Sequence, residues 1–251
     1  MSSDIPDRIP EQEPAQRVAS ELQLLLILSA LMAFTSLSID IYLPAMPTLQ
    51  RELQGNPELT LTGFLIGFGA AQLVWGPISD RIGRRRPLVM GMALFLIGSV
   101  GCALSQTMGQ MVFWRIFQAV GACTAPMLAR TMVRDLYTRT QAARMLSTLT
   151  VIMAIAPIAG PLLGGQIVRW ASWHWIFWLL ALIAAGMLVA LRRLPETLPA
   201  ERRATTPTHK AFSDYRILLA NRGFMRYVAC VTLYYISVYA FLAGSPGVYI
   251  E

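Results

Sequence analysis

The clearest pattern along the chain is a series of long apolar runs without charge, separated by short polar and often basic connections. Uncharged runs lie at 22–39, 59–79, 87–114, 145–168, 170–191 and 227–250. A helix needs about 20 mostly apolar residues to cross a bilayer. The pattern therefore predicts an all-α, polytopic membrane protein with helices near 22–48, 59–80, 87–105, 108–132, 145–168, 173–193 and 223–246.

Composition supports a membrane protein and excludes other classes. Of the 251 residues, 55% are apolar and 14% are charged, whereas a soluble domain carries about 25% charged residues. The apolar content excludes a disordered chain, and three cysteines are too few for a disulfide framework. Neither histidine, His174 or His209, belongs to a metal-binding or nucleophile motif. We therefore predict no metal, no cofactor and no enzymatic activity.

The connections divide the chain into four parts. Residues 1–21 are Pro-rich and acidic, which predicts a disordered cytoplasmic tail. Residues 22–194 carry six predicted spans and form a six-helix transmembrane bundle. Residues 195–221 are polar and Pro-containing, which indicates a cytoplasmic linker. Residues 222–251 hold a seventh helix, the first helix of a second bundle.

Basic residues are concentrated in alternate connections, which predicts the orientation. The other face carries only Arg51 and Arg169. The positive-inside rule therefore predicts a cytoplasmic N-terminus in the inner (plasma) membrane. Because the arginines are divided among loops, they form no single basic face for nucleic acid. The cytoplasmic set comprises Arg81, Arg84, Arg85, Arg86, Arg130, Arg134, Arg139, Arg144, Arg192, Arg193, Arg202, Arg203, Lys210, Arg216, Arg222 and Arg226.

A tryptophan cluster lies at the opposite end, at the start of the sixth predicted span. Trp170, Trp173, Trp175 and Trp178 surround His174. Amphipathic aromatic side chains favour the headgroup region, so we interpret the cluster as an interfacial belt. Stacking on a substrate is the alternative.

Two charged residues, Asp40 and Arg115, lie well inside predicted spans. Counting along the two helices places both about 10–12 Å below the outer boundary. Charges at this depth are costly and usually face a partner or water. Their matching depth and opposite charge predict that the two side chains meet, either as a functional pair or as a purely structural ion pair.

Such a pair has a definite proton chemistry. Burial favours the neutral acid, and a nearby guanidinium favours the carboxylate. Movement of Arg115, or arrival of a cationic substrate, therefore changes the proton occupancy of Asp40. We interpret Asp40 as a protonation site and Arg115 as the group that tunes it.

The connection between the second and third spans carries a specific motif. Residues 76–86 read Gly-Pro-Ile-Ser-Asp-Arg-Ile-Gly-Arg-Arg-Arg. Topology alone requires only the arginines and not this fixed G-x-x-x-D-R-x-G-R-R spacing. At this motif the chain resembles the major facilitator superfamily.

Two further motifs agree with that resemblance. Residues 115–121, Arg-Ile-Phe-Gln-Ala-Val-Gly, are similar to the intramembrane arginine motif of proton-coupled members. Residues 160–165, Gly-Pro-Leu-Leu-Gly-Gly, resemble the antiporter motif, with Ala156 where the family often has another glycine. Here Gly160, Gly164 and Gly165 permit close backbone approach, and Pro161 removes a helix hydrogen bond.

The segments 38–47, 134–137 and 221–224 make the chain look like the bicyclomycin-resistance (Bcr/CflA) group of drug:proton antiporters. The resemblance implies a 12-span fold of two bundles, with alternating access at a cavity between them. It also implies a cytoplasmic charge cluster that latches one conformation. This latch comprises Gly76, Asp80, Arg81, Gly83, Arg84, Arg85 and Asp135.

The resemblance implies export of drugs or small amphipathic metabolites in exchange for protons, across a lipid bilayer. The other five spans of the second bundle are absent from this sequence, so we expect the chain alone to be inactive. A non-transporting fragment or a partner subunit is the alternative, and a membrane-embedded enzyme is disfavoured.

Overall fold

The computed structural model describes residues 14–204, 215 and 217–249. The chain divides into two units, residues 1–203 and 204–251, each considered by itself. Every regular element in the described residues is helical. In the first unit these are α1 (Pro14–Asp40), η1 (Leu43–Ala45), α2 (Met46–Leu53), α3 (Glu58–Ile82), α4 (Arg85–Ala103), α5 (Met108–Ala122), α6 (Thr124–Leu136), α7 (Arg139–Met153), α8 (Ala156–Trp170), α9 (His174–Ala190), η2 (Leu191–Arg193) and η3 (Ala200–Arg202).

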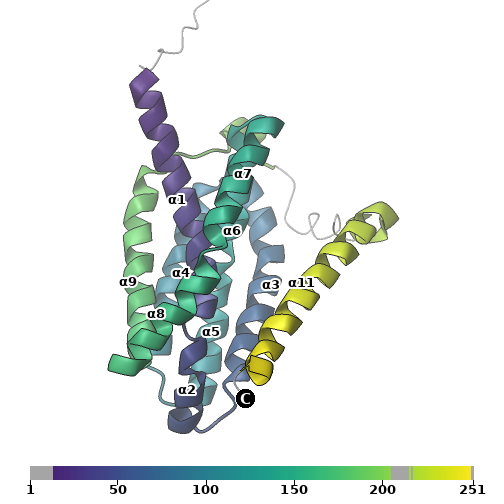
Figure 1. Ribbon diagram of the computed structural model, residues 1–251. Coiled ribbons are helices and arrows are strands. Elements are labelled where there is room, and N and C mark those ends of the chain that lie inside the picture. The colour runs from purple at the N-terminus through teal and green to yellow at the C-terminus, as the bar shows by residue number, and fades with distance from the viewer. Residues whose placement is uncertain (1–13, 205–214, 216, 250–251) are drawn as a thin grey trace, which may run out of the picture. The chain divides into compact units, whose positions relative to one another are not determined.

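Six stretches of the described chain are long and apolar enough to cross a membrane, which confirms the predicted fold class. They form an up-and-down bundle in the first unit (Figure 1). We call the end that carries Arg84 the arginine end and the end that carries Trp173 the tryptophan end. The stretches are Gln23–Leu53, Glu58–Ile82, Arg85–Ala103, Met108–Leu136, Arg139–Trp170 and His174–Arg193.

Three of these spans are interrupted, and a proline lies next to each interruption. Pro44 and Pro47 follow the end of α1, Pro126 lies in the first turn of α6, and Pro157 lies in the first turn of α8. Proline lacks a backbone N–H and fits best in the first turn of a helix. The prolines therefore divide long apolar runs into segments that change direction inside the bundle.

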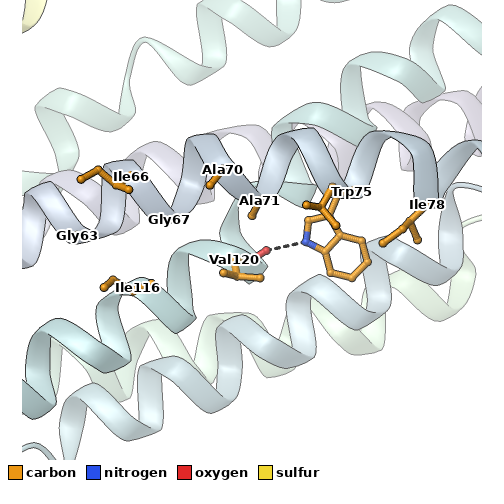
Figure 2. A pocket seen from close by; sticks show the side chains of 10 residues that line it. Gly63, Ile66, Gly67, Ala70, Ala71, Trp75, Ile78, Ile116 and Val120 are labelled. Atoms are coloured by element: carbon orange, nitrogen blue, oxygen red, sulfur yellow. Dashed lines mark hydrogen bonds between the residues drawn. The ribbon is translucent and has the colours of Figure 1, made fainter. Parts of the chain in front are cut away.

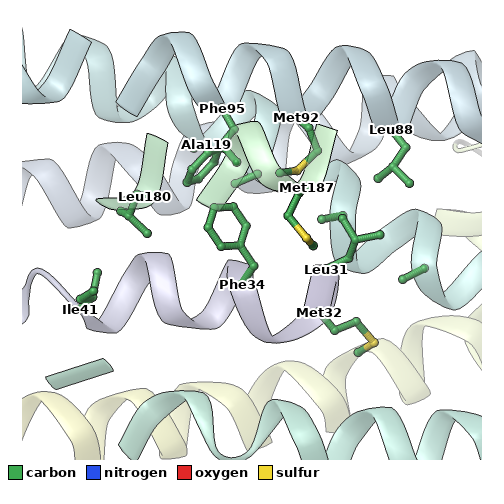
Figure 3. Close-up of a cluster of buried hydrophobic side chains, with 14 of the residues drawn as sticks. Leu31, Met32, Phe34, Ile41, Leu88, Met92, Phe95, Ala119, Leu180 and Met187 are labelled. Atoms are coloured by element: carbon green, nitrogen blue, oxygen red, sulfur yellow. The ribbon is translucent and has the colours of Figure 1, made fainter. Parts of the chain in front are cut away.

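The core lies between α1, α4, α5 and α9. Phe34 of α1 meets Phe95 of α4 edge to face, with ring centroids 4.8 Å apart. Figure 3 shows these two rings among buried residues of all four helices, including Met92, Ala119 and Leu180. Aromatic and aliphatic packing of this kind holds the four helices in fixed register.

Close approach of α4 and α5 requires a glycine. A Cβ atom built on Gly98 of α4 would lie 2.6 Å from the Cα atom of Gln118 on α5. Small residues at such contacts allow membrane helices to pack backbone against backbone. The approach brings polar groups of α4 and α5 within hydrogen-bonding distance.

Two predicted boundaries differ from the structure. Helix α1 begins at Pro14, inside the segment predicted as a disordered tail, because residues 15–21 lack glycine and proline and favour helix. The predicted linker begins with ordered chain, since Thr197 and Leu198 are buried. Residues 205–214 of that linker lie outside the described residues.

The prediction of an interfacial belt is wrong for one of the four tryptophans. Trp170, Trp175 and Trp178 are exposed, whereas Trp173 is 1% exposed. The Trp173 indole N–H donates to Glu52 Oε2 at 2.6 Å. Trp173 is thus an internal contact between the ends of α2 and α9.

In the second unit, α11 (Arg222–Tyr249) corresponds to the predicted helix at 223–246. The Asn221 side-chain oxygen accepts hydrogen bonds from the backbone N–H groups of Gly223 and Phe224, at 3.0 and 3.1 Å. Asparagine is a favoured N-cap because it satisfies N–H groups of the first turn.

Candidate functional site

Arg84 is the centre of a charge cluster at the arginine end. Its Nε donates to Asp135 Oδ2 at 3.0 Å, and its Nη1 donates to Asp80 Oδ1 at 2.5 Å and to Ser79 Oγ at 3.0 Å. These two ion pairs are the ones found among the described residues. The cluster joins α3, the start of α4 and the end of α6.

Some of the predicted latch residues meet directly in the structure, and others do not. Asp80, Arg84 and Asp135 meet directly, and Gly76 contributes its carbonyl oxygen, which accepts from Ser79 Oγ at 2.8 Å. Arg85 turns toward η2, where its Nη2 donates to the Arg192 carbonyl at 2.9 Å. Arg81 lies in the last turn of α3 and takes no part in the two ion pairs.

Glu196 completes this cluster and was missed from the sequence. Its Oε1 accepts from the backbone N–H of Arg84 at 2.7 Å, and its Oε2 accepts from that of Arg85 at 3.2 Å. These N–H groups belong to the start of α4 and lack partners within the helix. A carboxylate at a helix N-terminus also interacts favourably with the helix dipole.

Gly83 makes room for that carboxylate. Its φ angle is +94°, a conformation that favours glycine. A Cβ atom built there would collide with the carboxylate oxygens of Glu196 and lie 2.7 Å from its Cδ. The glycine of the motif is therefore needed for the turn and for the approach of Glu196.

The electrostatics of the cluster shift two pKa values. Burial opposes charge on Arg84, but its hydrogen bonds and attraction to Asp80 and Asp135 raise the pKa above its ordinary value. Burial also opposes charge on Glu196. The backbone N–H groups of Arg84, Leu198 and Arg85, with the charge of Arg203, hold the Glu196 pKa below its ordinary value.

Arg115 occupies a second site, deep in α5, where it is 0% exposed. Its guanidinium carbon lies 4.2 Å from the ring centre of Tyr42, 4.4 Å from that of Phe64 and 5.9 Å from that of Phe177. Its Nη1 donates to Gln118 Oε1 at 2.7 Å and to the Ser38 carbonyl at 3.4 Å. Aromatic faces stabilise a buried cation.

The predicted meeting of Asp40 and Arg115 is wrong in this structure, because no ion pair joins them among the described residues. Arg115 contacts Ser38 and Tyr42, which are four positions apart on one side of the chain. Asp40 is the last residue of α1, two positions from each of them. Matching depth was inferred from residue counts, but the two side chains point in different directions.

Asp40 instead faces the antiporter-type motif of α8. A Cβ atom built on Gly160 would lie 2.8 Å from the Asp40 Cβ, and one built on Gly164 would collide with the Ile41 carbonyl oxygen. Pro161 lies inside the helix, and Gly165 has open space. Two glycines of the motif therefore seat α8 against the end of α1 at Asp40.

An apolar groove runs between α3 and α5. It has a volume of about 540 Å³ and is lined by small and aliphatic residues, among them Gly63, Gly67, Ala70 and Ile116 (Figure 2). Trp75 also lines the groove, and its indole N–H donates to the Val120 carbonyl at 2.9 Å. The groove therefore suits an apolar surface.

Several residues of these sites were assigned no role of their own from the sequence. Gln118 lies three positions after Arg115, a helical spacing that could have indicated contact. Phe64 belongs to another span, and Glu196 lies 112 positions from Arg84. Among the described residues, no group of three or more His, Cys, Asp or Glu side chains could hold a metal ion.

Comparison with known proteins gives a consistent family. Residues 26–250 match the family model described as Major Facilitator Superfamily. The chain is 37% identical to the uncharacterized MFS-type transporter YdgK of Bacillus subtilis, covering 91% of this chain and 58% of that protein. It is 30% identical to multidrug resistance protein D of Escherichia coli, covering 82% of this chain and 52% of that protein.

A third relative is a bicyclomycin resistance protein homolog of Haemophilus influenzae, 26% identical over 90% of this chain and 58% of that protein. Among solved structures, the proton:xylose symporter XylE superposes with a TM-score of 0.66 at 17% identity, over 74% of this chain and 48% of the symporter. The chain thus spans about half the length of the curated relatives that it matches.

Proposed function

The chain belongs to the Major Facilitator Superfamily, and on that premise we propose that it forms one bundle of a proton-coupled exporter of drugs or small amphipathic metabolites. Relatives named for multidrug and bicyclomycin resistance support this substrate class. The family consists of transporters rather than enzymes. Transport then proceeds by alternating access between two bundles.

The contact between α8 and Asp40 carries the proton-coupling part of the proposal. Asp40 ends α1 inside a membrane span, and Gly160 of the antiporter-type motif packs on its Cβ. No described side chain forms an ion pair with Asp40. Burial of a carboxyl group in such surroundings costs much less free energy once the group takes up a proton.

Proton uptake at Asp40 supplies the driving force. One elementary charge moved across the membrane is worth about 2.3 kcal/mol per 100 mV. A movement of α8 against α1 changes the space around Asp40 and therefore its proton occupancy. Coupling of this movement to drug release links proton uptake to drug export.

The Arg84 cluster acts as the conformational latch in this proposal. Asp80 and Asp135 lie on helices that enclose the start of α4, and Arg84 ties them together. Arg84 is buried, Asp135 is partly buried and Asp80 is exposed, and separating the three charged groups breaks several charge-assisted hydrogen bonds at once. The cluster therefore favours the conformation in which this end of the bundle is closed.

Drug accumulation in cells that express the full-length protein tests the proposal. We expect lower accumulation of one or more drugs from a chemically diverse panel, an effect that depends on external pH. Asp40→Asn should remove this effect, and the exposed substitution Arg169→Gln should not. Unchanged accumulation of every drug, or full pH-dependent efflux by Asp40→Asn, contradicts the proposal.

The alternative is a fragment or partner subunit that does not transport. The shared length of about half of each relative favours it for the 251-residue chain by itself. We expect no proton-coupled efflux from vesicles that contain only this chain, because the cavity needs a second bundle. Robust efflux that depends on Asp40 in those vesicles would refute this part of the proposal.

A further inference from the structure

The guanidinium of Arg115 has one hydrogen-bonding edge that is used and one that is open. Nη1 donates to Gln118 and to the Ser38 carbonyl, on the used edge. Nε and Nη2 are buried, and no described residue accepts a hydrogen bond from either atom. The Nε–H and one Nη2–H point the same way and form the fork that binds a carboxylate with two parallel hydrogen bonds.

A series of hydrogen bonds across α4 and α5 determines which edge of the Arg115 guanidinium is open. Ser99 Oγ donates to the Phe95 carbonyl at 2.8 Å, so its lone pair accepts from Gln118 Nε2 at 2.7 Å. The amide oxygen of Gln118 must then face Arg115. If the Gln118 amide were reversed, its NH2 group would face the Nη1–H donor of Arg115. The series of hydrogen bonds therefore has one direction.

The open fork lacks a counter-ion. A fully buried charge without a partner is strongly unfavourable, and aromatic faces compensate for only part of that cost. Buried donors without acceptors are rare and need an explanation. Asp40 points toward α8, and both ion pairs in the described part of the chain belong to Arg84.

We propose that the Nε–Nη2 edge of Arg115 is a binding site for a carboxylate group, and that amphipathic carboxylates are among the transported compounds. This inference rests on the proposed transport function, since the site is closed here. Tyr42, Phe64 and Phe177 cover Arg115 from three different segments of the bundle. Relative movement of these segments within the bundle exposes the fork between aromatic faces, which suit the apolar part of such a ligand.

Binding of a matched pair of probes tests the site without requiring transport. The full-length protein in lipid nanodiscs is titrated with 2-naphthoate and with 2-naphthamide at neutral pH. The two probes share the ring system, and only the naphthoate offers two anionic oxygens. We expect naphthoate to bind about tenfold or more tightly than the amide, a preference typical of a bidentate charge-assisted contact.

Variants assign that preference to the fork. Arg115→Lys keeps a positive charge but loses the planar fork, and should lose most of the preference. Ser99→Ala releases Gln118 and should weaken the preference while leaving Arg115 in place. Arg169→Gln, at the exposed end of α8, is the matched control and should leave it unchanged. Size-exclusion profiles and helical circular dichroism check that each variant is folded.

The carboxylate could also be supplied by Asp40 in another conformation, and Asp40→Asn separates the two sources. If Asp40 competes for the fork, Asp40→Asn increases naphthoate affinity. If only a substrate supplies the carboxylate, the affinity does not change. Equal binding of the two probes, or a preference that survives in Arg115→Lys and Arg115→Gln, would overturn the proposal. Loss of transport with this preference intact would count against the proposed function alone.

Discussion

At the scale of single residues, the two sites use arginine in opposite ways. Arg84 donates to three acceptors, on Asp80, Asp135 and Ser79. Arg115 is enclosed by aromatic rings and keeps one edge free. An arginine paired with two carboxylates stabilises one arrangement of helices, whereas a buried arginine without a carboxylate partner is available for a ligand or a conformational change.

Glu196 provides a pH-dependent test at this scale. Its pKa is lowered in the folded state, so it stabilises the fold above its ordinary pKa of about 4.3. The stabilisation is lost as the pH falls through the lower folded value. We expect Glu196→Gln to lower the melting temperature at pH 7 and to match the wild-type chain in more acidic solution.

Thermal unfolding of the two purified chains from neutral to acidic pH measures this effect. Other carboxylates titrate in both chains and cancel in the comparison. A melting-temperature difference that stays constant with pH, or is absent at pH 7, would show that Glu196 does not act through its charge at the start of α4.

At the scale of elements, hydrophobic patterning predicted where helices lie but could not predict how they are rotated. The uncharged runs located the spans because burial in lipid forbids charge over a whole helix. The depths of Asp40 and Arg115 were likewise predicted from residue counts. Their directions could not be, because each residue turns a helix by about 100° and contacts such as Gly160 on Asp40 decide the final rotation.

The seam between α8 and α1 can be tested with two neighbouring glycines. Gly164→Ala places a methyl group against the Ile41 carbonyl, whereas Gly165→Ala meets open space. We expect Gly164→Ala to destabilise the bundle by about 1–3 kcal/mol, the usual cost of overpacking. Gly165→Ala should have little effect or should stabilise slightly.

Reversible unfolding in mixed detergent micelles measures both variants. Equal stability of the two variants would mean that α8 does not pack on α1 at Ile41. A loss of stability confined to Gly165→Ala would place the opposite face of α8 at the seam.

At the scale of the whole molecule, the fold could be predicted from one connection and from the apolar runs. The motif at 76–86 and the long uncharged runs identified the fold, and family comparison confirmed it. Glu196 could not be found in this way, because it meets α4 only after the chain has crossed the membrane repeatedly. Long-range contacts of loop residues have no local pattern in the sequence.

Orientation is the corresponding prediction. The basic connections predict that the arginine end faces the cytoplasm. With the native cysteines replaced, a cysteine at exposed Arg86 should be protected from an impermeant thiol reagent in intact cells, and one at exposed Glu58 should react. The reverse labelling pattern would invert the topology.

Proton movement driven by a drug tests the central claim most directly. The full-length protein, with its second bundle, is reconstituted in liposomes with a pH-sensitive dye inside, and a transported drug is added on one side. The account predicts that drug entry changes the internal pH in wild-type vesicles and leaves it unchanged with Asp40→Asn, although this variant still binds drug. Proton movement by Asp40→Asn equal to that of the wild-type protein would contradict the account.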